Sequence, residues 1–383
     1  MAAGPRPGAM RLAYFVHDVA DAAVLRRVRM IQAAGVAVTV IGFRRRATPL
    51  ESLDGARVVD LGRTGDGRFV QRIWAVLRNL AAFGAVREAV ADADVIMARN
   101  LETLVLAARA AKGRRLVYEC LDIHRMLLTD GVLQGLVQRV ERAALGKVDL
   151  IVTSSPRFAD AYFRERRGVD TPLLLVENKL PMTEHEAAPS IVPPVAGPPW
   201  VVGWFGMLRC KRSLAILGAL AAGSNGRIEI LIAGMPSDAE FTDFAETVAA
   251  MPGVTFVGRY TAADLPALYG RVHFAWAIDF FEEGLNSAWL LPNRLYEAVG
   301  HGAVPIALSR VETGAWLLRN GVGLVVDDPQ GVQPRLSAMT ADDYARLAAA
   351  VAATPRATIQ TTAEENTMIV DTIVAGTIRN AVP

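Results

Sequence analysis

Two short stretches place an aspartate and a histidine directly after an apolar run that predicts a buried β-strand. Asp122 and His124 follow "RLVYEC", and His17 and Asp18 follow "RLAYFV". In either pair a carboxylate or imidazole at the end of a strand can take a proton from an attacking hydroxyl group, which is general base catalysis. The carboxylate can also raise the basicity of its histidine. A second interpretation stays open, in which Asp18 or Asp122 caps a helix by accepting backbone N–H bonds.

A third stretch, "GMLRCKRS", places three cationic side chains after another predicted strand and before a predicted helix. Gly206 permits a close approach of the backbone, and the helix start offers free N–H groups and the positive end of its dipole. Arg209, Lys211 and Arg212 would bind a diphosphate there, since arginine can hold it through two parallel hydrogen bonds. The alternative is a basic turn that is simply solvated.

The stretch "LLPNRLYEAVGHGAVPIAL" predicts a helix that starts at Pro292, ends at Gly302 and leads into a short core strand. Asn293, Arg294 and Glu297 lie near its start, and Asn293 and Glu297 share a face because they are four residues apart. Such side chains beside a helix N-terminus suit an anionic or hydroxyl-rich ligand. An ordinary surface helix would carry the same residues.

Apolar runs that alternate with helical stretches position all of these side chains. Continuous apolar runs of this kind predict parallel strands that are buried on both faces of a sheet. The predicted strands are residues 11–16, 36–43, 94–98, 115–120, 148–154 and 172–178 in the first half, and 200–206, 228–234, 253–258, 272–278, 303–308 and 321–328 in the second. Two such sets predict an α/β protein of two doubly wound, Rossmann-like domains that face each other across a cleft.

A proline-rich segment separates the two sets of strands. Residues 181–199 contain six prolines in nineteen positions, a composition typical of a semi-rigid linker. We therefore expect an N-terminal domain at 1–180 and a C-terminal domain at 200–360. The last stretch, 361–383, predicts a final helix.

Composition narrows the class of protein further. A chain of 383 residues with 52% hydrophobic and 21% charged residues is long enough for two domains and too apolar to be disordered. It has no G-x-G-x-x-G after the first predicted strand and no Walker A motif, which argues against a dinucleotide-dependent dehydrogenase and a P-loop enzyme. Two cysteines, no apolar segment of membrane-spanning length and no secretory apolar region lead us to expect a reducing, cytoplasmic location.

Positive charge is concentrated in the first half of the chain. Residues 1–180 contain 28 Lys and Arg against 19 Asp and Glu, a net +9, whereas the remainder contains 13 against 20, a net −7. Within the first half, residues 67–90 predict a basic amphipathic helix in which Arg68, Arg72 and Arg78 flank an apolar stripe. Such a helix suits an anionic membrane surface, and a helix that packs its stripe on the core would show the same pattern.

Three ordered motifs within residues 200–330 carry a family resemblance. They are "PGVTFVGRYTAADLPALYGRVHFAWAIDF", "PNRLYEAVGHGAVPIAL" and "NGVGLVVDDP". Together they resemble the central stretch, the donor-binding helix and a later glycine-rich segment of GT-B glycosyltransferases of the family 4-like kind. The first half is similar more loosely, in "VDLIVTSSPRFADAYF" and "LLLVENKLP". The resemblance implies the GT-B fold and a final helix that crosses back to the N-terminal domain.

The resemblance also implies roles for single residues. Glu297 matches the glutamate that binds the ribose hydroxyls of a nucleotide sugar, and Arg209 and Lys211 stand near the basic pair that holds its diphosphate. Many retaining members carry a second glutamate eight residues before the first, and here that position is Trp289. This departure weakens any assignment to the standard retaining group.

The stretch "FFEEGLNSAWLLPNRLYE" is more similar to glycosyltransferases of succinoglycan-type exopolysaccharide assembly, some of which are inverting. In this loop Asn286 and Ser287 would hydrogen-bond to sugar hydroxyls. The alternative is that they only cap the loop. The predicted catalytic residues are thus Asp122, His124, His17 and Asp18, and the predicted donor-binding residues are Gly206, Arg209, Lys211, Asn286, Ser287, Asn293, Arg294 and Glu297.

The resulting hypothesis is a hexosyltransferase that moves a sugar from a nucleotide sugar, expected to be a UDP-sugar, to a lipid-linked oligosaccharide or saccharide acceptor. The process would be exopolysaccharide biosynthesis. Cationic side chains and helix dipoles would stabilise the leaving diphosphate, so we expect neither a metal ion nor a cofactor. The acidic "DAD" at 92–94 starts a predicted strand and is interpreted as surface.

The expected partners are the nucleotide-sugar donor, the acceptor and an anionic surface on the inner face of the cytoplasmic membrane, with no nucleic acid. Two other functions fit the same sequence. One is a nucleotide-sugar 2-epimerase of the same architecture, and the other is a catalytically silent, nucleotide-sugar-binding scaffold subunit.

Overall fold

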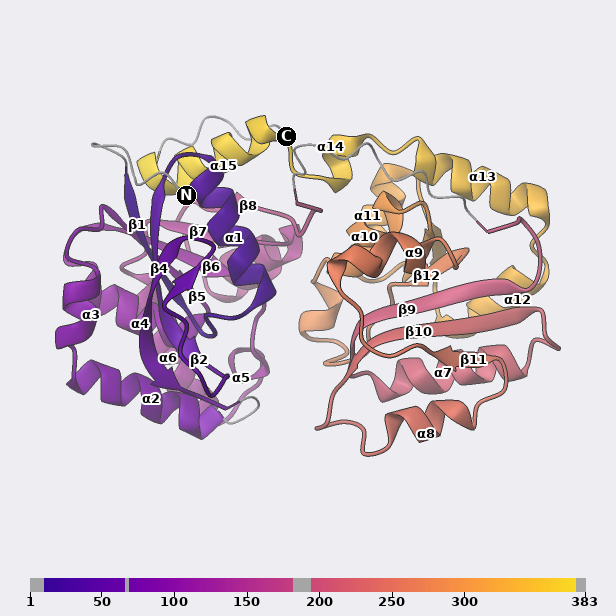
Figure 1. Cartoon of the computed structure of the whole chain (residues 1–383), viewed down its shortest axis with the longest axis horizontal. Helices are drawn as coiled ribbons and strands as arrows, with labels where there is room; N and C mark the ends of the chain where they lie inside the picture. The colour runs from indigo at the N-terminus through magenta and orange to yellow at the C-terminus, as the bar shows by residue number, and fades with distance from the viewer. Residues whose placement is uncertain (1–9, 66–68, 182–193, 377–383) are drawn as a thin grey trace. The chain divides into compact units, whose positions relative to one another are not determined.

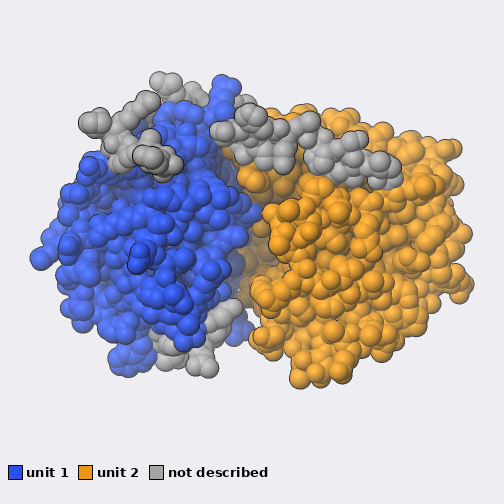
Figure 2. Space-filling model, in the orientation of Figure 1, with its two compact units in different colours: residues 1–177, 362–383 blue, residues 178–361 orange. Residues whose placement is uncertain are grey.

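The computed structural model describes residues 10–65, 69–181 and 194–376, without the side chains of residues 69–73. The chain divides into two compact units: unit 1 comprises Met1–Glu177 with Thr362–Pro383, and unit 2 comprises Asn178–Thr361 (Figure 1; Figure 2). Each unit has its own sheet of mainly parallel strands, so the predicted α/β class with two parallel-sheet domains is confirmed. Most of the predicted linker at 181–199 lies outside the described residues.

Unit 1 is built on an eight-stranded sheet in the order β3-β4-β2-β1-β5-β6-β7-β8. Its strands are β1 (Arg11–Val16), β2 (Ala37–Arg44), β3 (Ser52–Leu53), β4 (Ala56–Arg63), β5 (Val95–Arg99), β6 (Arg115–Cys120), β7 (Leu150–Thr153) and β8 (Leu173–Leu175). All neighbours pair in parallel except β3 and β4. These two strands were not predicted because β3 has only two residues and charged residues interrupt the apolar residues of β4.

Helices cover both faces of this sheet. They are α1 (Ala22–Ala33), α2 (Phe69–Ala81), α3 (Gly84–Ala89), α4 (Leu101–Ala110), α5 (Arg125–Leu128), α6 (Val132–Leu145), the π-helix η1 (Phe158–Arg166) and α15 (Ala363–Ala375). The final helix α15 buries Ile369, Val370 and Ile373 in the core that also contains β1 and α1. The stretch 67–90 was predicted as one helix, and the structure breaks it into α2 and α3.

Unit 2 has a six-stranded sheet in the order β11-β10-β9-β12-β13-β14, with every pair parallel. Its strands are β9 (Trp200–Leu208), β10 (Ile228–Pro236), β11 (Val254–Phe256), β12 (Phe274–Trp276), β13 (Val304–Leu308) and β14 (Leu324–Val326). Each corresponds to a predicted apolar run. The inner strands are buried on both faces of the sheet, as in β13, where all five residues are buried, whereas the edge strand β11 is only partly buried.

The helical elements of unit 2 are α7 (Lys211–Ala222), α8 (Phe244–Ala249), η2 (Ala262–Asp264), α9 (Leu265–Tyr269), η3 (Asn286–Ala288), α10 (Asn293–Gly300), α11 (Glu312–Asn320), η4 (Pro329–Gly331), α12 (Val332–Ser337), α13 (Ala341–Ala352) and α14 (Arg356–Ile359). Figure 1 shows α7 and α8 on one side of strands β9 and β10 and α9 and α10 on the other.

The strand order defines one topological switch point in each sheet. In unit 1 it lies between β1 and β5, and in unit 2 it lies between β9 and β12. Open α/β sheets bind their ligands beyond the carboxyl ends of the strands at such a point. We therefore expect the ligand-binding side chains to follow β1, β5 and β6 in unit 1 and β9, β12 and β13 in unit 2.

Candidate functional site

Glu297 lies one turn into α10, as the sequence predicted, although Pro292 caps this helix and is not its first residue. Oε2 of Glu297 accepts a hydrogen bond from the Tyr269 hydroxyl at 3.4 Å. The pKa of Tyr260 is raised to about 12, mainly by burial and to a smaller extent by the charge of Glu297, while the charge of Arg294 lowers it. The two tyrosines, Arg294 and Glu297 thus form one polar group beside α10.

This group lies near the carboxyl end of β9. The Phe205 ring centroid is 5.0 Å from that of Tyr269 and 6.4 Å from that of Tyr260. Neither tyrosine was identified from the sequence. The usable signal was the position of Tyr260, which follows the predicted strand at 253–258 by two residues. Asn293, the first residue of α10, is exposed.

Gly206 was predicted at the end of a strand, and the structure extends β9 to Leu208 and pairs Gly206 with Gly234 of β10. Both glycines have positive φ, 112° and 141°. A Cβ on Gly234 would lie 1.9 Å from the carbonyl oxygen of Gly206. The close approach of the two strands therefore depends on Gly234, whereas a Cβ on Gly206 would have the Tyr260 hydroxyl, at 4.0 Å, as its nearest neighbour.

The three predicted cations after β9 separate into two groups. Arg209 lies before α7, with its guanidinium carbon 4.4 Å from the Phe281 ring centroid. Arg212, in the first turn of α7, lies 4.2 Å over Phe280. Lys211 instead has its ammonium nitrogen 3.7 Å from Glu240, with 65% of its side chain exposed. The structure thus brings Arg209 and Arg212, but not Lys211, against the loop that follows β12.

That loop, residues 279–289, is held by its own hydrogen bonds. Asp279 accepts the backbone N–H of Phe281 at 2.9 Å, and Glu282 has a positive φ of 62°. Ser287 donates its hydroxyl to the carbonyl of Glu282 at 2.9 Å, which is the loop-capping alternative considered above. Asn286 begins η3 and is buried. These hydrogen bonds restrict the loop whose rings Phe280 and Phe281 contact the two arginines.

Glu283, in the same loop, joins two arginines. Its carboxylate pairs with Arg212, and Oε1 lies 3.3 Å from Arg310. Arg310 follows β13 and also donates to the backbone oxygen of Asp327 at 2.9 Å. Neither Glu283 nor Arg310 was identified from the sequence, although Arg310 follows the predicted strand at 303–308 by two residues.

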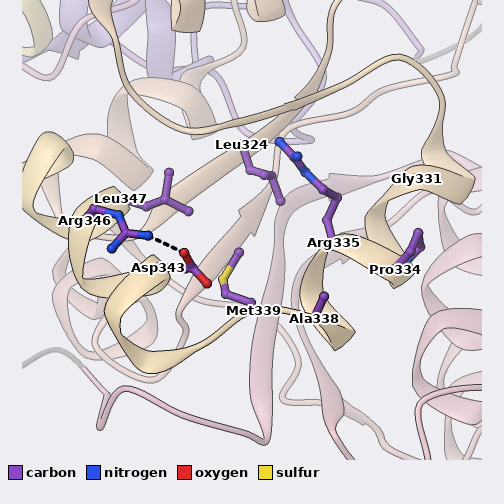
Figure 3. A pocket seen from close by; sticks show the side chains of 9 residues that line it. All are labelled: Leu324, Gly331, Pro334, Arg335, Ala338, Met339, Asp343, Arg346 and Leu347. Atoms are coloured by element: carbon purple, nitrogen blue, oxygen red, sulfur yellow. Dashed lines mark hydrogen bonds and ion pairs between the residues drawn. The ribbon is translucent and has the colours of Figure 1, made fainter.

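A cavity of about 670 Å³ lies elsewhere in unit 2, between α12 and α13 (Figure 3). Arg335, Met339 and the ion pair of Asp343 with Arg346 lie along it. None of the predicted donor-binding residues lines this cavity, so it is separate from the candidate site at the strand ends.

In unit 1, His17 follows β1 and is held between two side chains. Its Nε2 lies 3.4 Å from Asp21, and its Nδ1 lies 3.4 Å from the Asn100 amide nitrogen. Asp18 is buried and lies 3.6 Å from Arg45. The structure therefore pairs His17 with Asp21 instead of the predicted Asp18, and the helix cap is Asp21 as well.

The charge on Asp21 fixes the orientation of the His17 ring. Burial would raise the pKa of Asp21, but the hydrogen bond from His17 and the charge of Arg99 outweigh it and hold the pKa well below its ordinary value. An ionised Asp21 accepts a hydrogen bond from the N–H group at Nε2, and Nδ1 then accepts a hydrogen bond from the Asn100 amide. Asn100 has a positive φ of 69°, a strained conformation for asparagine.

Unit 1 also contains a buried cluster of ion pairs centred on Glu119. Glu119 of β6 is 0% exposed and accepts hydrogen bonds from Arg27 at 2.6 Å, Arg99 at 2.7 Å and the Tyr14 hydroxyl. Burial opposes ionisation of Glu119, but the two arginines lower its pKa to about 2. The sequence signal was an acidic residue inside an otherwise apolar predicted strand.

Asp122 and His124 follow β6, and both are exposed. His124 caps α5, and its Nδ1 accepts the backbone N–H of Met126 at 3.3 Å. A ring nitrogen that accepts carries no proton, so the neutral ring carries its proton on Nε2. The Nε2 atom can therefore donate a hydrogen bond but cannot act as a base, which leaves the Asp122 carboxylate as the better base of the pair.

Within the described residues no group of three or more His, Cys, Asp and Glu side chains is placed to hold a metal ion. In the same part of the chain no helix combines the length and the apolar character needed to cross a membrane.

Comparison with known proteins identifies the family of this chain. Residues 20–179 match the glycosyl transferase 4-like domain. The chain is 44% identical over 352 residues to the succinoglycan biosynthesis protein ExoL of Rhizobium meliloti (strain 1021), covering 88% of this chain and 87% of that protein. The chain belongs to the GT-B glycosyltransferases of the family 4-like kind. Within them it is a relative of ExoL.

Solved structures agree on the fold. The lipopolysaccharide outer core galactosyltransferase WaaB superposes with a TM-score of 0.64 at 14% identity, over 96% of this chain and 99% of WaaB. Anabaena Alr3699/HepE in complex with UDP gives a TM-score of 0.65 at 15% identity, over 96% of this chain and 100% of HepE. The predicted GT-B fold is therefore confirmed.

Proposed function

We propose that this protein transfers a hexosyl group from a UDP-sugar to a lipid-linked or saccharide acceptor in exopolysaccharide biosynthesis. The observation that carries the proposal is the set of cationic side chains that follow β9 and β13, together with the carboxylate on α10. Arg209, Arg212 and Arg310 supply positive charge, and Glu297 supplies a carboxylate. A nucleoside diphosphate needs both kinds of group.

The relatives favour a uridine nucleotide and a polysaccharide pathway. HepE was solved with UDP and with UDP-glucose, and ExoL is named for succinoglycan biosynthesis. On this proposal Glu297 accepts hydrogen bonds from the two ribose hydroxyls. Arg294, one helical turn before it, adds positive charge toward the phosphates.

The acceptor is activated, on the same proposal, by Asp122. Its carboxylate takes the proton of the acceptor hydroxyl as that oxygen attacks the anomeric carbon and the bond to the diphosphate breaks. His124 positions the acceptor by donating from Nε2, since its Nδ1 accepts the Met126 amide. His17, engaged by Asp21 and Asn100, has a positioning role instead of the catalytic role expected from the sequence.

We assign the stabilisation of the leaving diphosphate to arginine instead of a metal ion. Preorganised cations placed where negative charge develops are usually the largest single contribution to catalysis. Arg209 and Arg212 lie over the rings of Phe281 and Phe280, and these contacts restrict the two side chains before the donor binds. Activity that persists in the presence of a chelator would support this assignment.

A peripheral position on an anionic membrane fits the exposed helices of unit 1. The apolar side chains that face solvent are Trp74 and Leu77 on α2, 68% and 50% exposed, and Val132, Leu133, Leu136 and Val140 on α6, 95%, 50%, 57% and 41% exposed. Both helices contact α4. Arg78, Arg139 and Arg142 are exposed beside them, and the one acidic residue of α6, Glu141, is buried against Arg167.

Apolar side chains flanked by arginines, without exposed acidic neighbours on the same helices, match the headgroup region of an anionic bilayer. Of the three arginines predicted for this role, Arg78 is described, whereas Arg68 and the side chain of Arg72 lie outside the described residues. An acceptor carried by a lipid would be reached at such a surface.

The test is a transfer assay with purified protein, UDP-glucose or UDP-galactose, and membranes that contain a lipid-linked saccharide. The proposal expects release of UDP only when acceptor is present, together with a lengthened acceptor. Epimerised UDP-sugar without acceptor would support the 2-epimerase alternative. UDP-sugar binding without either reaction would support the scaffold alternative.

A further inference from the structure

The carboxylate of Glu283 is held between two arginines, one in the first turn of α7 and the other in the loop after β13. Glu283 follows β12, Arg212 follows β9 and Arg310 follows β13. Because β12 lies between β9 and β13 in the sheet, the carboxyl ends of three adjacent strands converge on this ion pair. The contact between Arg212 and Glu283 spans the topological switch point, where such sheets bind ligands.

The convergence carries more positive charge than Glu283 offsets. Arg209 lies over Phe281, and no carboxylate in the described part of the chain forms an ion pair with it. The Asp327 carboxylate accepts from the Ser309 hydroxyl at 2.8 Å, and Arg310 contacts Asp327 through the backbone oxygen of that residue instead of its carboxylate. Glu283 is thus the one carboxylate in the described part of the chain that forms an ion pair with any of these three guanidinium groups.

The ion pair is open to dissolved ligands. The side chain of Glu283 is 43% exposed, and those of Arg212 and Arg310 are each 49% exposed. Ion pairs at such exposure are weak and are readily exchanged. The Arg212 guanidinium lies over the Phe280 ring, and arginine in such a position can still present N–H groups to an anion.

We propose that Glu283 occupies a phosphate-binding position, from which a phosphate group of the donor diphosphate displaces its carboxylate. This inference rests on the proposed function, since it concerns the same donor. Carboxylates and phosphates are bound by arginine in the same forked geometry, so one can replace the other on Arg212 and Arg310. Return of the carboxylate after transfer then helps to expel the nucleoside diphosphate.

The experiment measures anion affinity by calorimetric titration of the full-length protein with inorganic pyrophosphate and with UDP. Glu283→Gln removes the charge and keeps the size of the side chain. Affinity for both anions is expected to rise about three- to tenfold, because two weak competing ion pairs are lost. Glu283→Ala should show the same gain.

Glu240→Gln is the matched control, since Glu240 is an acidic neighbour of the same basic segment but pairs with Lys211, at 3.7 Å. It should leave pyrophosphate affinity unchanged. Arg310→Gln should weaken pyrophosphate binding, and Glu283→Gln should give a smaller gain in that background because the two changes share one interaction.

Unchanged or weaker pyrophosphate binding by folded Glu283→Gln and Glu283→Ala proteins would overturn the inference, since Glu283 would then only support the arginines. Pyrophosphate has neither uracil nor ribose. A gain for pyrophosphate without UDP binding by any variant would therefore support this inference and count against the UDP donor. UDP binding by the unmodified protein, with no gain in affinity in the variants, would support the UDP donor and overturn this inference.

Discussion

The Tyr269 hydroxyl donates to Oε2 of Glu297 across 3.4 Å and so joins the end of α9 to α10. Tyr269 is buried, and burial followed by the charge of Glu297 raises its pKa well above the ordinary value. The phenol therefore remains protonated and remains a donor at neutral pH. It restricts the Glu297 side chain, which a residue that binds two adjacent hydroxyl groups requires.

Glu297→Ala is expected to weaken binding of UDP and UDP-glucose by roughly 10- to 150-fold. A hydrogen bond to a charged group contributes about 1.5–3 kcal/mol, and tenfold in affinity corresponds to about 1.4 kcal/mol. Calorimetric titration of the folded variant measures the change. Tyr269→Phe serves as the comparison and should cost less than tenfold, because it removes only the support. Unchanged affinity in Glu297→Ala would place the ribose elsewhere.

Asp122→Asn is expected to lower turnover by about 100-fold or more while UDP-sugar affinity stays near normal, since loss of a general base typically costs 10²- to 10⁴-fold. His124→Asn is the matched variant, because asparagine also caps a helix and would preserve the start of α5. It should reduce turnover less. A turnover of Asp122→Asn near that of the unmodified protein would transfer the role of base to another residue.

The elements of the fold were predictable because buried parallel strands leave continuous apolar runs in the sequence. "WVVGWFG" and "AVPIAL" each became a strand. Strands β3 and β4, whose residues are only partly buried, left no such run. The break between α2 and α3 was missed because the apolar periodicity continues through Ala82 and Phe83.

Candidate site residues were predictable where the rule of strand ends applied, as for Arg209 and Glu297. The pairings were not, because they depend on strand order. Arg212 meets Glu283 only because β12 lies beside β9, and Asn100 meets His17 only because β5 lies beside β1. One sequence contains no direct record of these adjacencies.

Glu119 is expected to make the stability of unit 1 depend on pH. Its pKa falls from 4.5 to about 2 on folding, and at 1.36 kcal/mol per tenfold change in proton affinity this contributes about 3 kcal/mol. The contribution is complete above pH 4.5 and is lost as the pH falls toward 2, because the unfolded chain takes up the proton first. Hydrogen exchange of β6 peptides between pH 6 and 3 measures it.

Glu119→Gln tests this assignment, because glutamine has no charge to titrate. At neutral pH the variant should be less stable by about 3–5 kcal/mol, since Arg27 and Arg99 would lose their buried counter-ion. Its stability should also vary less with pH than that of the unmodified protein. Equal pH dependence in the two proteins would show that other carboxylates dominate the acid response.

The membrane proposal predicts that the purified protein sediments with anionic liposomes at low salt and is released at high salt, because surface charge attraction is screened. Replacing Arg68, Arg72 and Arg78 together with glutamine should abolish sedimentation. Leu136→Ser on α6 should weaken it, since this side chain is 57% exposed. Leu318→Ser, at 63% exposure on α11 of unit 2, is the matched control and should have no effect. Sedimentation that survives the triple replacement would assign α2 to packing alone.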